Sequence, residues 1–266
     1  MSKSIQLFCA WSGLGTAVIM GVGLLLAGVM PVPLASNSSP AEVVDFYSGG
    51  AHVAAGLVMA SLGICLMLPV VALISIFMAR MEGRTPILAL IQLIAGALTV
   101  VLNILPMLLM ATATFRPDRD ADLTVLLNDF AWLLFVSPIG PFVVQNIAIG
   151  TAILRDTRGI FPRWVGYLNY WVALMFAPDV LAYFFKAGPF AWRGFFIIYM
   201  GLVAYGAFVI TMTFVLRNAV RDQDDDEEPV DAALEDGPST AEHPETGWAG
   251  GDFASGRPMK TAVSLT

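Results

Sequence analysis

Apolar residues run along this chain in six long stretches, separated by short polar or charged segments. Each stretch has about 20 residues or more, enough for an α-helix to cross a bilayer core of about 30 Å. The pattern predicts an all-α, polytopic membrane protein. Between the first two stretches, Ser39-Pro40-Ala41-Glu42 has capping-box spacing and predicts a short surface helix to Tyr47. The six predicted transmembrane helices cover about residues 7–30, 50–78, 86–114, 123–154, 164–185 and 191–216.

The fourth stretch, residues 123–154, is interrupted at its middle by prolines. As one helix it would be roughly 48 Å long, more than a bilayer core requires. A proline lacks the amide hydrogen of the helical ladder and disfavours α geometry in the residue before it. Ser137 and Pro138 match the N-cap and first residue of a second half-helix that begins inside the membrane; a simple proline kink is the alternative. The predicted helix break consists of Ser137, Pro138, Gly140 and Pro141.

The composition agrees with a membrane protein, and the C-terminal region differs from the rest of the chain in its charge. The chain is 57% hydrophobic and 13% charged, and its mean hydropathy is +0.74. Residues 1–217 contain eleven Lys and Arg against nine Asp and Glu, whereas residues 218–266 contain three against twelve. The second region has too few apolar residues to offset the entropy of an ordered chain. We therefore predict a transmembrane domain over 1–217 and a disordered acidic cytoplasmic tail over 218–266.

The basic residues in the loops indicate an orientation. Short cytoplasmic loops are enriched in Lys and Arg, and eight such residues flank one side of the predicted helices against four on the other. This predicts a cell (inner or plasma) membrane protein with both termini in the cytoplasm. The first apolar stretch is longer than the apolar core of a signal peptide, about 7–15 residues, so we expect it to be retained. The eight residues are Lys3, Arg80, Arg84, Arg155, Arg158, Arg163, Arg217 and Arg221.

Ionisable residues within the predicted spans are candidates for function, because they are rare and costly in a membrane. Asp179 follows Pro178 in the fifth span, and Asp129 lies in the outer part of the fourth. Together with nearby polar residues they could form one outward-facing cavity in which opposite charges neutralise each other. Charges scattered at headgroup level and purely structural ion pairs are the alternatives. The candidate substrate-binding residues of this outer cavity are His52, Asp129, Asp179, Lys186, Arg193, Asn103 and Asn128.

Neutral amides form a second polar set, nearer the predicted cytoplasmic side. Hydrogen bonds between helices from such residues contribute roughly 0.6–2 kcal/mol each. Helix packing is the default interpretation, and lining the cytoplasmic half of a permeation path is the alternative. This inner polar cluster consists of Gln92, Gln145, Asn146 and Asn169.

Several chemistries lack the residues they need. His52 has no second span histidine to complete a haem or metal site, since His243 lies in the tail. No lysine lies within a predicted span, which excludes a retinal-type Schiff base, and neither a nucleophilic-serine motif nor a phosphate loop is present. We therefore predict no catalytic residue, no metal and no cofactor.

Three function classes are compatible with these features. The broken span and the outer polar residues favour a small-molecule transporter or permease-like protein. A non-catalytic scaffold or accessory subunit of a membrane complex is the alternative. A membrane enzyme acting on a lipid-soluble substrate is the third, with Asp129, Asp179 and His52 as its acid-base set. The predicted partners are the lipid bilayer and a protein bound by the acidic tail, with no nucleic acid.

Overall fold

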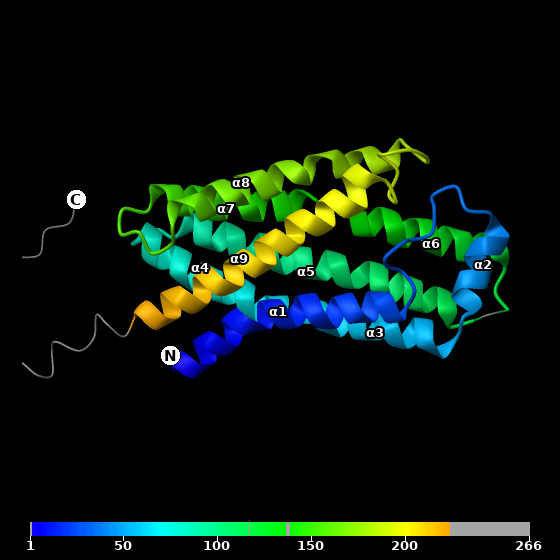
Figure 1. Ribbon diagram of the computed structural model, residues 1–266, viewed down its shortest axis with the longest axis horizontal. Helices are drawn as coiled ribbons and strands as arrows, with labels where there is room; N and C mark the ends of the chain where they lie inside the picture. The colour runs from blue at the N-terminus through cyan, green and yellow to red at the C-terminus, as the bar shows by residue number, and fades with distance from the viewer. Residues whose placement is uncertain (1, 117, 137–138, 224–266) are drawn as a thin grey trace, which may run out of the picture. The chain divides into compact units, whose positions relative to one another are not determined.

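The computed structural model describes residues 2–116, 118–136 and 139–223, and the elements in these ranges are helices joined by turns and loops (Figure 1). Six helical segments are long and apolar enough to cross a membrane, which indicates a multi-pass membrane protein as predicted. They are α1 (Lys3–Leu26), α3 with α4 (Ala51–Cys65 and Met67–Glu82), α5 (Ile87–Thr114), α6 with α7 (Ala121–Val136 and Gly140–Arg155), α8 with the 3-10 helix η1 (Arg163–Met175 and Ala177–Tyr183), and the π-helix η2 with α9 (Phe195–Tyr199 and Met200–Asp222).

The last helix extends further than the sequence predicts. Residues 218–222, assigned to the tail, are the final residues of α9. Ala219 and Val220 are buried there against the bundle, so apolar contacts continue the helix beyond Leu216. Gln223 follows as the C-cap of α9, and the remainder of the predicted tail lies outside the described residues.

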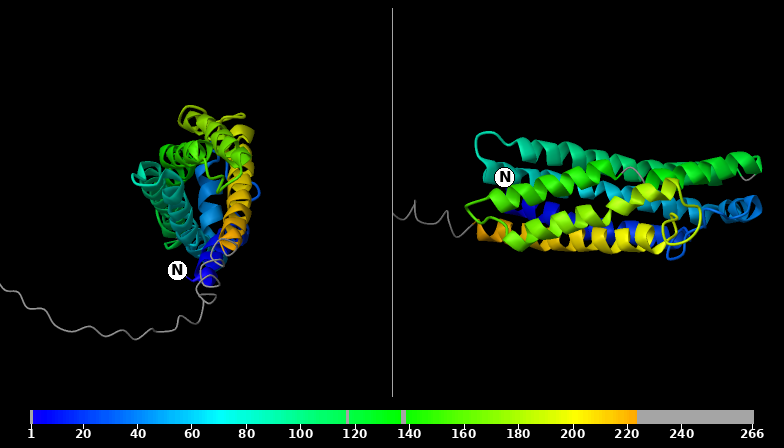
Figure 2. Two further views of the ribbon diagram at one scale, coloured as in Figure 1. Left: turned by 90° about the vertical axis from the view of Figure 1, so that its left-hand side faces the viewer. Right: turned by 90° about the horizontal axis from the view of Figure 1, so that it is seen from above.

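The helices form an antiparallel bundle, and α9 lies beside α1 and α8 (Figure 2). α1 begins and α9 ends at the same end of the bundle, which we call the terminal end (Figure 1). The last turn of α4 and the loop after α7 meet there, because the Arg158 guanidinium donates to the backbone carbonyl of Arg80 at 2.9 Å. The opposite end, which we call the α2 end, carries the short helix α2 (Pro40–Ser48), held by the predicted capping box between Ser39 and Glu42.

Buried apolar side chains form two clusters along the bundle. One includes Phe77, Ile149 and Phe208, on α4, α7 and α9. The other includes Met110 and Trp132, on α5 and α6. The candidate site lies where the two clusters meet.

Candidate functional site

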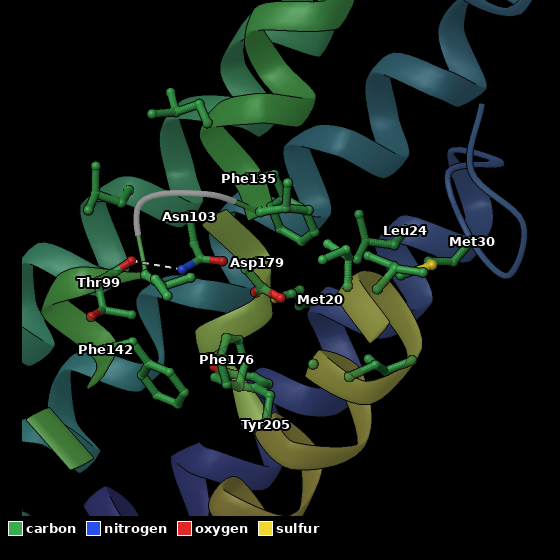
Figure 3. A pocket seen from close by; sticks show the side chains of 18 residues that line it. Met20, Leu24, Met30, Thr99, Asn103, Phe135, Phe142, Phe176, Asp179 and Tyr205 are labelled. Carbon is green, nitrogen blue, oxygen red and sulfur yellow. Dashed lines mark hydrogen bonds between the residues drawn. The ribbon is translucent and has the colours of Figure 1, made fainter. Parts of the chain in front are cut away.

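A partly open cavity of about 110 Å³ lies between α1, α5, the α6–α7 break, η1 and α9 (Figure 3). We call it the break cavity. Its lining comes from both apolar clusters: Phe142 belongs to one, and Val136 and Ile197 belong to the other. Most of the lining is aliphatic or aromatic. The polar residues that line it are Thr99, Asn103, Asp179 and Tyr205.

Four of the spans that line the break cavity contain a proline or a change in helix type, whereas α1, which also lines it, is regular. In α5, Pro106 cannot donate to the carbonyl of Leu102, a lining residue. The fourth span is divided into α6 and α7, the fifth ends in a 3-10 turn, and the sixth begins with a π-helix. Non-helical backbone at membrane depth is tolerated where it is enclosed by protein or lines a cavity. Irregular stretches of four spans therefore meet at the cavity, while the interruption between α3 and α4 lies outside its lining.

The described helices end and begin on either side of the predicted break. α6 ends at Val136, and α7 begins at Gly140 with Pro141 in its first turn, where a missing amide hydrogen removes no helical bond. Ser137 and Pro138 lie outside the described residues. The residue before α7 is Ile139, whose side chain makes no capping bond, so the helix begins two residues later than a start at Pro138 implies. Ile139 and Val136 line the cavity from the two sides of the break.

Asp179 is brought into the cavity by the proline that precedes it. Pro178 cannot donate to the carbonyl of Leu174, so α8 ends at Met175 and the chain tightens into η1. In this turn the backbone N–H of Asp179 donates to the carbonyl of Phe176 at 3.1 Å. The Asp179 side chain is only 3% exposed and points into the cavity (Figure 3). Its Oδ1 atom has no hydrogen-bond partner among the described residues.

Other lining groups present oxygen atoms and aromatic rings. The Asn103 amide nitrogen donates to the carbonyl of Thr99 at 2.8 Å, which leaves the amide oxygen on the side of the cavity (Figure 3). The buried hydroxyl of Tyr205 likewise has no partner within the described part of the chain. The rings of Phe142 and Phe176 meet edge to face, with centroids 4.8 Å apart. The cavity can thus hold a mainly apolar group and offers a few oxygen atoms at one place.

Asn128 and Asp129 lie at the α2 end and contribute to packing. Asn128 is buried, and its amide oxygen accepts a hydrogen bond from the Tyr47 hydroxyl at 3.0 Å. Its nitrogen donates to Asp129 at 3.3 Å. Burial, and to a smaller extent the Asp129 carboxylate, raises the pKa of Tyr47 above its ordinary value, so the hydroxyl stays a donor. These contacts hold α2 against α6.

The three remaining predicted residues of the outer cavity are exposed. His52 lies in the first turn of α3. The backbone carbonyl of Lys186 accepts from the Ser36 hydroxyl at 2.6 Å, while Arg193 lines a separate cavity of about 310 Å³ with Glu42. Of the seven predicted residues, only Asn103 and Asp179 thus line the break cavity. The structure therefore places the seven residues apart, and the segment after η1 carries Lys186 and Arg193 out to the α2 end.

The aromatic lining was not predicted from the sequence. Phe135, Phe142, Phe176 and Tyr205 line the cavity, but aromatic residues are common in transmembrane helices. The sequence did contain one signal for the location of the cavity. Pro106 and Pro178 each remove a helical hydrogen bond in a span that lines it.

The inner polar cluster lies on regular helices toward the terminal end. Gln92, Gln145, Asn146 and Asn169 are all buried, on α5, α7 and α8. The oxygen of Gln92 accepts from the Ser75 hydroxyl. Asn146 and Asn169 each donate to the carbonyl four residues earlier in their own helix, both at 2.8 Å. Asn146 and Asn169 therefore meet part of their hydrogen-bonding requirement within their own helices, and Gln92 does so with the neighbouring helix α4.

Comparisons of the chain with protein-family models, with curated proteins and with solved structures give no match. The chemistry of the break cavity is therefore the basis for a function.

Proposed function

We propose that this protein is a small-molecule transporter or permease-like protein whose substrate binds in the break cavity. The observation that carries the proposal is the buried carboxyl of Asp179 in a cavity at the interruption of the candidate span Ala121–Arg155. Transporters commonly bind their substrates near the membrane midplane between discontinuous helices, and unwound backbone there supplies polar groups.

The cost of Asp179 supports a function over a purely structural role. A polar group buried without a partner destabilises a fold by about 1–3 kcal/mol on mutational scales. The Oδ1 atom of Asp179 has no such partner among the described residues, so the carboxyl adds little to packing. Asn146 and Asn169 also have buried oxygens without partners among the described residues, but Asp179 differs from them in lining the break cavity. The enzyme alternative requires Asp129 and His52 beside Asp179, but neither lines the break cavity.

The orientation follows from the basic residues at the terminal end. The last turn of α4, which contains Arg80, and the loop that contains Arg158 meet there, and α9 ends nearby. By the positive-inside tendency this end faces the cytoplasm, with the α2 end outside, in the cell membrane. Reporter fusions after Glu82 and after Ser48 test this orientation, because only the fusion at the cytoplasmic end retains a cytoplasmic reporter's activity.

Flux into vesicles tests transport. The full chain is reconstituted into liposomes, and the entry of labelled tetramethylammonium, methanesulfonate and erythritol is compared with that into protein-free vesicles. We expect at least one of these slowly permeating solutes to enter faster through the protein. Gly201 lines the cavity, and a Cβ atom there would lie 3.6 Å from the Phe176 ring, so Gly201→Leu should fill the cavity and abolish the flux.

The matched control lies on the same helix. A Cβ atom at Gly206 would meet no atom within 4 Å, so Gly206→Leu should leave the flux unchanged. Entry of all three solutes at the protein-free rate, or equal flux through both leucine variants, would contradict transport through this cavity.

A further inference from the structure

We infer that the ligand of the break cavity is a small organic cation with an apolar body, and that it exchanges with a proton on Asp179. The inference rests on the proposed function in that it assigns the ligand class to the same cavity. It also stands for a protein that only binds this ligand.

The first observation is that the Asp179 carboxyl is buried without a partner for its Oδ1 atom. An ionised carboxylate in an apolar site needs a cationic partner or strong donors, and otherwise it takes up a proton. Asp179 is almost fully buried, and no hydrogen bond to its Oδ1 atom comes from the described residues. Two states satisfy the site: a neutral carboxylic acid in the empty cavity, or a carboxylate paired with a bound cation.

No described residue that lines the break cavity carries a positive charge. Among the described lining residues, Tyr205 is the only titratable side chain besides Asp179. Lys186 and Arg193 are exposed and do not line the cavity. The first turn of α7 adds the partial positive charge of a helix N-terminus, which reduces the cost of a carboxylate but does not neutralise it. The missing full charge must therefore come with the ligand.

The polar atoms in the lining suit a donor ligand better than an anion. The Asp179 carboxyl and the Asn103 amide oxygen are acceptors, and the Asn103 nitrogen is already bonded to the carbonyl of Thr99. An alkylammonium group has the donors that these oxygens lack. A metal ion is disfavoured, because no group of three or more His, Cys, Asp or Glu side chains forms among residues 2–116, 118–136 and 139–223.

The aromatic rings and the size of the cavity define the rest of the ligand. Phe142 contacts Phe176 and Tyr205, with ring centroids 4.8 and 5.8 Å away. Rings of this kind attract organic cations, by about 0.5–2 kcal/mol for each favourable contact. A cavity of about 110 Å³ is comparable with one of about 150 Å³ that accepts benzene. The ligand is thus a monocation with a compact apolar body.

The exchange balances in charge and atoms. In the empty cavity the Asp179 carboxyl carries its proton. When the ammonium ion enters, the O–H bond breaks, the proton leaves to water, and the carboxylate pairs with the ammonium. One positive charge enters and one leaves, so the cavity keeps its net charge and no oxidant or reductant is required.

Binding to the purified full chain tests the ligand class without any need for transport. Three probes share a tert-butyl body and differ in charge: 3,3-dimethylbutylammonium, 3,3-dimethylbutanol and 3,3-dimethylbutanoate. We expect calorimetry to show the ammonium binding about tenfold or more tighter than the alcohol, as close charge pairs in apolar sites do, with the carboxylate weakest. Equal binding of the three probes, or binding of none, would overturn the inference.

Proton release tests the exchange. Calorimetry in buffers of different ionisation enthalpy should show about one proton released for each ammonium bound, and the affinity should fall as the pH is lowered, approaching tenfold per unit. Binding of the alcohol should release none. Tight ammonium binding with no proton released would overturn the exchange.

Matched carboxyl variants locate the proton. Asp179→Asn should weaken ammonium binding about tenfold or more and abolish proton release, while binding of 3,3-dimethylbutanol is kept. Asp129 does not line the cavity, so Asp129→Asn should change neither ammonium binding nor proton release. If Asp179→Asn fails to fold, the proton count of the native chain and the ranking of the three probes still decide the matter.

The result is separable from that of the flux experiment. Ammonium binding with proton release but no flux would support the cation site and contradict transport. Flux of erythritol or methanesulfonate without ammonium binding would overturn the cation site and leave transport standing.

Discussion

Around the break cavity, Asp179 lies on a 3-10 turn beside other spans that have lost regular helix, whereas Asn146 and Asn169 lie on regular helices that pack closely. The α7–α8 crossing near these amides is tight, because a Cβ atom at Gly150 would come 2.9 Å from the carbonyl oxygen of Gly166. At the cavity, a Cβ atom at Gly201 would meet its nearest neighbour only at 3.6 Å.

The difference between the two regions follows from the hydrogen-bond donors and acceptors that each side chain carries. An amide carries its own donors, so the nitrogens of Asn146 and Asn169 bond to carbonyls of their own helices, although their oxygens have no partner among the described residues. A carboxylate has only acceptors, so Asp179 needs a proton or a donor from outside its own turn. Neutral amides therefore suit tight helix packing, while the carboxyl suits an exchangeable ligand.

The largest expected contrast comes from adding the same side chain to both regions. Gly150→Leu forces α7 and α8 apart and should lower the free energy of unfolding by about 3 kcal/mol. Gly201→Leu enters the cavity and should change it by less than about 1 kcal/mol. Unfolding in detergent, followed by helical circular dichroism, measures both, with Gly206→Leu as the reference for an unobstructed position on α9. Equal losses at Gly150 and Gly201 would mean that the two regions are packed alike.

Removing the polar group should have opposite signs in the two regions. Asp179→Leu removes an unpaired buried carboxyl and should stabilise the fold by about 1–2 kcal/mol, while abolishing cation binding. Asn169→Leu removes the hydrogen bond to the Val165 carbonyl and should destabilise by about 1 kcal/mol. The same unfolding assay measures the two variants. A loss of stability from Asp179→Leu would show that its carboxyl supports packing, as the amides do.

A smaller effect is expected at the α2 end, away from both regions. Tyr47→Phe removes the hydrogen bond to Asn128 and should cost about 1 kcal/mol. Burial, with the Asp129 carboxylate second, raises the pKa of Tyr47 above that of an unfolded tyrosine, about 10. The stability from Tyr47 should therefore be full below about pH 10 and fall as the pH rises further. Urea unfolding measures the difference in the free energy of unfolding between wild type and Tyr47→Phe, which should become smaller only above that pH. A smaller difference already near neutral pH would contradict this.

Much of the fold was predictable because membrane insertion acts on local sequence. Six spans follow from continuous apolar runs, and α2 follows from its capping box at Ser39. The irregular turn at Asp179 follows from Pro178, because the loss of a backbone donor needs no tertiary information. Local sequence was enough wherever the cause lay within one helix.

The composition of the site depends on which helix faces meet, and periodicity does not fix that. Asn128 was expected in the cavity, yet it bonds to Tyr47 because α2 folds back onto α6. Tyr205 lines the cavity, but its place is set by the packing of α9 against helices distant in sequence. The depth of His52, Lys186 and Arg193 likewise depends on how the loops at the α2 end fold.

The most direct test of the central claim is anomalous X-ray diffraction from crystals of the full chain grown with 4-bromobenzylammonium. The account predicts a bromine peak inside the break cavity, among the rings of Phe142, Phe176 and Tyr205, with the ammonium group on the side of Asp179. A bromine peak only at other places, or a cavity closed by the side chains of α5 and α9, would contradict it.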